Sequence, residues 1–314
     1  MTAPPAGLFD RLGVRLGAPV VVGARRLPPI WLVVLAAVGG SLLLILATTD
    51  WSHLNDEYAY WLAGAHLASG APLYDPSAHP GTPYAYWYPP SVAQVMAPLT
   101  SFVSADAFSV VWTALLLGCL WWLAGRNVLV ALALIAFIPV AEELRVRNVH
   151  LVIAVLAVLA LRRSSLFWIP AAALKMTPVL GLAYLAAAQR WRETFIAGSI
   201  GAAVLAASFL LAPGAWQSFI DVVGLRAGAD GGSIFPLPFA ARFPVGAALA
   251  LIAGRLALRA ERGYGDRRVA ESLLIVALTL ANPTFWVTAF SLLVAILPLW
   301  RTAPRGSDGA PAHT

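Results

Sequence analysis

Charged side chains are scarce in this chain. Asp, Glu, Lys and Arg make up 11% of its 314 residues, whereas hydrophobic residues make up 60% and the mean hydropathy is +0.78. A soluble domain carries about 25% charged residues. Most of the surface must therefore face an apolar environment, and a lipid bilayer is the obvious one.

Cysteine and nucleotide-binding motifs are also nearly absent. The single cysteine, Cys119, excludes an intramolecular disulfide and argues against a cysteine-based metal site. No P-loop, G-x-G-x-x-G or zinc motif occurs. The net charge of +6 does not indicate nucleic-acid binding, because the basic residues stand in short clusters between apolar runs, as the positive-inside rule predicts.

The apolar runs predict an all-α membrane protein, a polytopic bundle of about ten transmembrane helices. We expect these helices near residues 30–49, 107–124, 127–141, 149–161, 164–174, 178–189, 194–212, 239–258, 269–281 and 284–299. Several are shorter than the ~20 residues of a straight span, so neighbouring helices must cover their ends.

Charge predicts the orientation of these spans. Residues 164–189 could form one helix, but a hairpin that turns at residues 175–178 keeps Arg162 and Arg190 on the same side. With that hairpin the basic clusters share one side, and both termini are cytoplasmic. We divide the chain into a basic cytoplasmic segment (1–29), a transmembrane domain (30–300) and a disordered cytoplasmic tail (301–314).

The loop at residues 50–106 is expected on the outer face, and it differs from the rest of the chain. It contains five acidic and many aromatic residues but no Lys or Arg. Asp56 and Glu57 follow the first span closely. A carboxylate there could be partly desolvated and act as a base, although it could also be solvated or cap a helix. Apolar residues at 58, 61, 62, 65 and 68 predict an amphipathic helix on the outer membrane face, with Gly70 as its C-cap.

The order of short motifs in this region resembles a known family. They are Asp56, a Tyr-containing helix, G-x-P-L-Y-D at 70–75, Y-P-P at 88–90, A-P-L at 97–99, and L-K-x-x-P at 174–178 followed by Q-R-W-R at 189–192. Together they resemble the bacterial integral-membrane mannosyltransferases of glycosyltransferase family 87, in the GT-C superfamily. The family's G-Q-x-N element corresponds to Arg147-Asn148-Val149-His150, where only the amide is kept.

The resemblance implies that the sugar comes from a polyprenyl phosphate rather than from a nucleotide sugar. It implies that Asp56 is the general base of an inverting transfer and that cations stabilise the leaving lipid phosphate. The candidates for binding the substrates or the lipid phosphate are Lys175, Arg145, Arg147, Glu57, Asn148, His150 and Tyr86.

The candidate site residues also have simpler, purely structural interpretations. Lys175 could simply extend to the lipid headgroups, and Arg145 and Arg147 could pair with Glu142 and Glu143. The aromatic residues 86–88 could stack on sugar rings or belong to an interfacial belt. His53 with Asp56 and Glu57 could suggest a divalent metal site, but the spacing is not diagnostic, and we expect no cofactor.

The sequence thus predicts a multi-pass glycosyltransferase of the plasma membrane. It would move a mannosyl residue from a polyprenyl-phosphate donor to a glycolipid or lipoglycan acceptor on the outer face. One alternative is the same chemistry with arabinose or glucose. Others are a transporter or flippase of lipid-linked sugars, and a non-catalytic subunit of a complex that makes envelope polysaccharide.

Overall fold

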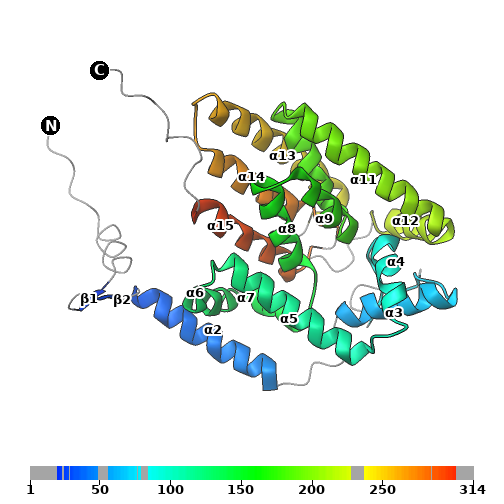
Figure 1. Cartoon of the computed structure of the whole chain (residues 1–314), viewed down its shortest axis with the longest axis horizontal. Helices are drawn as coiled ribbons and strands as arrows, with labels where there is room; N and C mark the ends of the chain where they lie inside the picture. The colour runs from blue at the N-terminus through cyan, green and yellow to red at the C-terminus, as the bar shows by residue number, and fades with distance from the viewer. Residues whose placement is uncertain are drawn as a thin grey trace.

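The computed structural model describes residues 20–22, 25–27, 29–48, 56–75, 77–78, 84–227, 237–283 and 285–301, which are mostly helical (Figure 1). Two short antiparallel strands, β1 (Val20–Val22) and β2 (Arg25–Leu27), precede the first helix. Most of the predicted basic segment, His53 and residues 302–314 of the predicted tail lie outside the described residues.

Helices make up most of the described residues. In chain order they are α2 (Ile30–Thr48), α3 (Asp56–Ser69), α4 (Pro90–Leu99), α5 (Ala105–Leu123), α6 (Val128–Ile135), α7 (Ile138–Val146), α8 (His150–Arg162), η1 (Ser165–Phe167), α9 (Trp168–Leu174), η2 (Thr177–Val179), α10 (Leu180–Ala187), α11 (Trp191–Leu211), α12 (Pro213–Ala227), α13 (Phe239–Glu261), α14 (Arg267–Leu280), η3 (Val287–Ala295) and α15 (Ile296–Arg301).

Four of the described helices are long and apolar enough to cross a membrane: α2, α5, α11 and α13. A fifth span results if α7 and α8, which meet at 113°, form one broken crossing. The helical membrane fold is therefore confirmed, but the count of about ten spans is not. The other helices are shorter, and half or more of the residues of α8 and α14 are buried inside the bundle.

Two segments differ from the sequence expectation. The expected helix at 127–141 breaks after Ile135, because Pro139 cannot continue a helix from the preceding turn and instead lies in the first turn of α7. The expected loop at 213–238 contains α12. Trp216, Phe219 and Val222 recur every three residues on this helix and are buried, which is the spacing of an apolar helix face.

The predicted hairpin at residues 175–178 is confirmed. α9 ends at Leu174 and η2 begins at Thr177, with Pro178 in its first turn. Gly181 of α10 lies directly against the ring of Trp168 in α9, because a Cβ at Gly181 would be 2.4 Å from that ring. The two helices therefore fold back on each other and leave Lys175 in an extended conformation at the turn.

Helix α3 forms as predicted, and Gly70 ends it with a positive φ of 73°. Residues 58, 61, 62 and 65 stay partly exposed and residue 68 is exposed, so the protein leaves the apolar face expected against the membrane only partly covered. The fully buried side is lined by Glu57, Tyr60 and small residues such as Gly64, where a Cβ would lie 2.6 Å from that of Met96 in α4. Close approach of α4 therefore requires a residue without a side chain at Gly64 on the fully buried side.

Two arginines at helix ends, Arg162 and Arg301, lie at the end of α8 opposite its start. At the C-terminal end of α8, Arg162 donates to the Leu299 carbonyl over 2.9 Å and pairs with Glu271 of α14. Arg301 at the end of α15 donates to the Leu123 carbonyl of α5. Because α8 has 13 residues, about 20 Å separates this basic end from the N-terminus of α8.

Candidate active site

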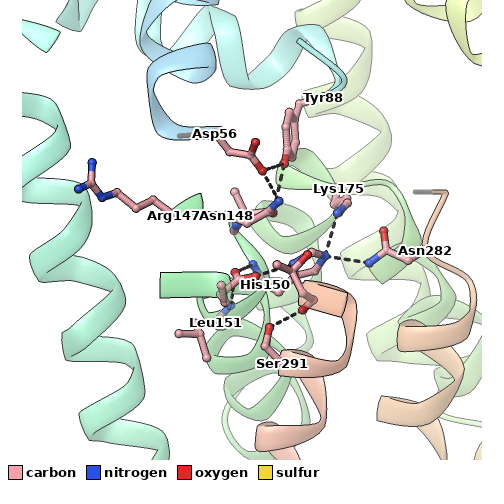
Figure 2. Close-up of polar contacts among 12 residues, drawn as sticks. Asp56, Tyr88, Arg147, Asn148, His150, Leu151, Lys175, Asn282 and Ser291 are labelled. Atoms are coloured by element: carbon pink, nitrogen blue, oxygen red, sulfur yellow. Dashed lines mark hydrogen bonds and ion pairs between the residues drawn. The ribbon is translucent and has the colours of Figure 1, made fainter. Parts of the chain in front are cut away.

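The break between α7 and α8 brings the residues of the 147–150 element to the centre of the molecule. Arg147 ends α7 in the left-handed conformation, with φ 55° and ψ 47°. Its carbonyl accepts a hydrogen bond of 2.8 Å from the indole of Trp112. This turn directs Asn148 toward α3 and places His150 at the start of α8 (Figure 2). The segment Arg147–His150, which corresponds to the family's G-Q-x-N element, is therefore a turn that orients the side chains of Asn148 and His150.

Asp56, the first residue of α3, is half-buried against this turn. The amide of Asn148 donates to its Oδ2 atom. The hydroxyl of Tyr88 lies 3.5 Å from the same oxygen and 3.1 Å from Oδ1 of Asn148. Tyr60 donates to the Tyr88 hydroxyl over 2.9 Å. The carboxylate is thus held from two sides.

Burial raises the pKa of Asp56 from 3.8 to about 7. The positive charge of Lys175 lowers this pKa, and the negative charges of Glu143 and Glu57 raise it, but desolvation is the largest effect. At neutral pH a large share of Asp56 is ionised while its proton affinity is high. That is the balance that a general base needs.

A second group of polar side chains surrounds His150 (Figure 2). Its Nδ1 lies 2.9 Å from Oε2 of Glu143, and its Nε2 lies 2.8 Å from the Lys175 ammonium and 2.9 Å from the Asn282 amide nitrogen. His150 and Glu143 are almost completely buried, and Lys175 is 8% exposed. Three segments that are distant in sequence meet here: residues 143–150, Lys175 and Asn282.

Lys175 is the only lysine of the sequence. Burial lowers its pKa from 10.5 to about 8, against the opposing effects of Glu143 and Asp56. Its ammonium lies 5.7 Å from the centre of the Tyr88 ring, whose hydroxyl contacts Asp56. Tyr88 therefore separates a carboxylate from a cation within one site.

Glu57 and Arg147 form a separate pair beside this site. Arg147 Nη1 donates to Glu57 Oε1 and, over 2.6 Å, to the Ser109 hydroxyl. Ser109 also donates to Glu57 over 2.9 Å. The Glu57 side chain is 2% exposed, whereas that of Arg147 is 27% exposed. Arg147 thus pairs with Glu57 rather than with Glu143, and it fastens α7 to α3.

We expect Arg147→Gly to lower stability. Glycine removes the left-handed strain, worth about 1 kcal/mol, but it leaves a buried Glu57 without its cation, which costs about 3 kcal/mol at the lower end of the range for buried pairs. The Tm of the detergent-solubilised variant should fall. Adding Glu57→Gln should restore part of it, and Arg145→Ala, at a partly exposed pair, should change it little. An unchanged Tm in Arg147→Gly would contradict the role of the pair.

Two other predicted residues lie in contacts outside the cluster. Arg145 pairs with Glu142 one helical turn away, as the plainer interpretation suggested. The Tyr86 hydroxyl donates to the Pro89 carbonyl over 2.7 Å and accepts from the Ala93 amide, so Tyr86 stabilises the start of α4. Tyr88, two residues later, takes the position beside Asp56.

Sequence reasoning missed the roles of Glu143, Tyr88, Asn282 and Arg242. Asn282 stands before a proline, a pair typical of a turn, and its side chain points to His150. The buried Arg242 of α13 donates to the carbonyls of Leu237, Asn282 and Pro283 and so holds that turn. A charged residue within an apolar helix was the available signal for Arg242.

Metal binding has no support from the described side chains, where no group of three His, Cys, Asp or Glu residues could hold an ion. His53 of the considered metal site lies outside the described residues.

Comparison with protein families gives a match over most of the chain. The sequence profile of glycosyltransferase family 87 matches residues 86–308. The chain belongs to glycosyltransferase family 87. This membership makes it a glycosyltransferase with membrane helices, consistent with the GT-C superfamily. The matched range of this transferase includes Tyr88, Asn148, His150 and Lys175, whereas Asp56 precedes it. No curated protein and no solved structure matches the chain.

Proposed function

We propose that this glycosyltransferase moves a mannosyl residue from a polyprenyl-phosphate donor to a glycolipid or lipoglycan on the outer face of the plasma membrane, with inversion. The observation that carries the proposal is the carboxylate of Asp56 and the ammonium of Lys175 on two sides of Tyr88. Such a pair suits a reaction in which one oxygen loses a proton while another gains negative charge.

In the proposed reaction Asp56 accepts the proton of an acceptor hydroxyl. The acceptor oxygen forms a bond to the anomeric carbon from the face opposite the phosphate, and the bond between that carbon and the phosphate oxygen breaks. The polyprenyl phosphate leaves with the bonding electron pair and gains one negative charge. Lys175 lies where it can stabilise that charge, and a β-linked donor gives an α-linked product.

The distribution of charge supports an outer-face site with cytoplasmic termini. The arginines at the ends of α8 and α15 lie at the end of the bundle opposite His150. By the positive-inside rule that end is cytoplasmic, and the site then faces outward. Exposed apolar side chains along α2 and α11, such as Leu44 and Leu210, suit contact with lipid.

The direct test uses purified protein in liposomes with a radiolabelled polyprenyl-phosphate-mannose donor and a panel of glycolipid acceptors. We expect a labelled α-linked lipid product from this donor. A nucleotide-activated mannose donor, tested in parallel, should give none. Donors that carry arabinose or glucose, tested in parallel, identify the sugar. Transport of the lipid-linked sugar across the bilayer without a new glycosidic bond would overturn the proposal in favour of a flippase.

The two perturbed groups predict a narrow, bell-shaped pH profile of kcat/KM. Activity should rise as Asp56 loses its proton, near its raised pKa of about 7, and fall as the Lys175 ammonium loses its proton, near its lowered pKa of about 8. The maximum then lies between these values. NMR of protein labelled at lysine carbons gives a direct check of the upper limb, because the chain has one lysine. A lower limb near pH 4 would contradict a raised pKa of Asp56.

A further inference from the structure

The carboxylate of Glu143 reaches from α7 across the start of α8. Oε1 accepts hydrogen bonds from the backbone N–H groups of His150, over 2.5 Å, and Leu151, over 3.3 Å. Oε2 faces Nδ1 of His150 over 2.9 Å. An ionised carboxylate only accepts hydrogen bonds, and a helix N-terminus favours its negative charge. The contact with Nδ1 therefore requires the proton of the ring to be on Nδ1.

The other ring nitrogen must then be an acceptor, because a neutral imidazole has one donor and one acceptor. Both neighbours of Nε2 are donors: the ammonium of Lys175 and the amide nitrogen of Asn282. The side-chain nitrogen of Asn282 faces Nε2 of His150. The buried Oδ1 atom of Asn282 has no hydrogen-bond partner among the described residues. A proton on Nε2 would face these two donors with no acceptor.

We propose that Glu143 and His150 are positioning residues for the transfer reaction. Glu143 holds His150 in the Nδ1–H tautomer, and Nε2 then holds the Lys175 ammonium beside Tyr88. This inference rests on the proposed function for its catalytic consequence. His150 acts through Lys175 rather than as a ligand of the lipid phosphate. Both of its ring nitrogens already make hydrogen bonds, and His150 is only 1% exposed.

The tautomer can be measured without any substrate. Protein labelled with ¹⁵N-histidine gives five imidazole signal sets, and the set that disappears in His150→Gln belongs to His150. We expect a neutral ring protonated at Nδ1 in the wild type. In Glu143→Gln the side-chain amide can donate to Nδ1, so the share of the Nδ1–H form should fall. An Nε2–H ring or an imidazolium in the wild type would overturn the inference, whatever the activity of the protein.

Kinetics then separate positioning from simple capping of α8. Glu143→Gln should lower kcat about 10- to 100-fold, as loss of an outer partner of a reactive group commonly does. In His150→Gln an amide oxygen replaces Nε2 as the acceptor for Lys175, independently of any tautomer. Adding Glu143→Gln to that background should change kcat by no more than about twofold.

If Glu143→Gln lowers kcat equally in the wild type and in the His150→Gln variant, Glu143 acts only as a cap of α8. That result would overturn the positioning role. Glu142→Gln, which changes the neighbouring glutamate of a partly exposed pair, is the matched control and should retain the wild-type kcat. If no donor is turned over by the wild type, the proposed function fails, whereas the tautomer measurement still decides the arrangement of Glu143 and His150.

Discussion

Asp56→Asn is expected to reduce sugar transfer about 10²- to 10⁴-fold, the usual contribution of a general base. Asparagine keeps the size of the side chain, and its carbonyl oxygen can still accept the hydrogen bond from Asn148. It cannot accept the proton of the acceptor hydroxyl. The loss should therefore appear in kcat, with donor binding nearly unchanged. Transfer of labelled sugar under single-turnover conditions measures this effect.

Asp106→Asn is the matched control for this substitution. Asp106 is an exposed carboxylate in the first turn of α5, outside the site, and its replacement should leave kcat near the wild-type value. Both proteins should fold, which size-exclusion chromatography and circular dichroism can check. Near-normal turnover by folded Asp56→Asn would exclude Asp56 as the base and would direct attention to Glu143, the other buried carboxylate close to Lys175.

Lys175→Met should have the second-largest effect. Methionine has a similar length but no charge, so the leaving phosphate loses a preorganised cation in a poorly solvated site. Removal of one such group costs about 10²- to 10³-fold in kcat. The variant should also lose the alkaline limb of the pH profile, because the group assigned to that limb, with a pKa of about 8, is gone.

Lys175→Arg tests whether a positive charge at this position is sufficient for activity. Arginine keeps the charge, but its larger guanidinium does not fit the place of the ammonium between Nε2 of His150 and the ring of Tyr88. Partial activity without an alkaline limb is expected. Arg163→Met removes an exposed cation at the opposite end and should behave as wild type. A Lys175→Met protein with a wild-type kcat would remove Lys175 from the mechanism.

Local sequence features predicted several elements because their causes are local. Gly70 ends α3 since it adopts a positive φ, and Pro178 begins the helix after the turn at Lys175. The long apolar runs predicted α2, α5, α11 and α13, because only composition and length decide whether a helix suits a bilayer. The short runs were ambiguous, since they can be spans, broken spans or helices inside the bundle.

The buried face of α3 and the partners of Arg147 depended on tertiary contacts. Apolar spacing predicted the side of α3 that faces the membrane, but it did not indicate the side that packs against α4 at Gly64. Arg147 could have paired with a neighbour in sequence, yet the left-handed turn after α7 sends it to Glu57, 90 residues away in sequence. Periodicity and local charge carry no information about such contacts.

By itself, the sequence determined that this is a helical membrane protein of glycosyltransferase character, because hydropathy and short motifs are properties of the chain alone. It also singled out Asp56 and Lys175 as candidates, since a carboxylate and a lysine are conspicuous in so apolar a chain. Only the tertiary structure decided that Tyr88, Glu143 and Asn282 join them. Burial and hydrogen-bond geometry control the pKa values and the histidine tautomer, and both arise only when distant segments pack together.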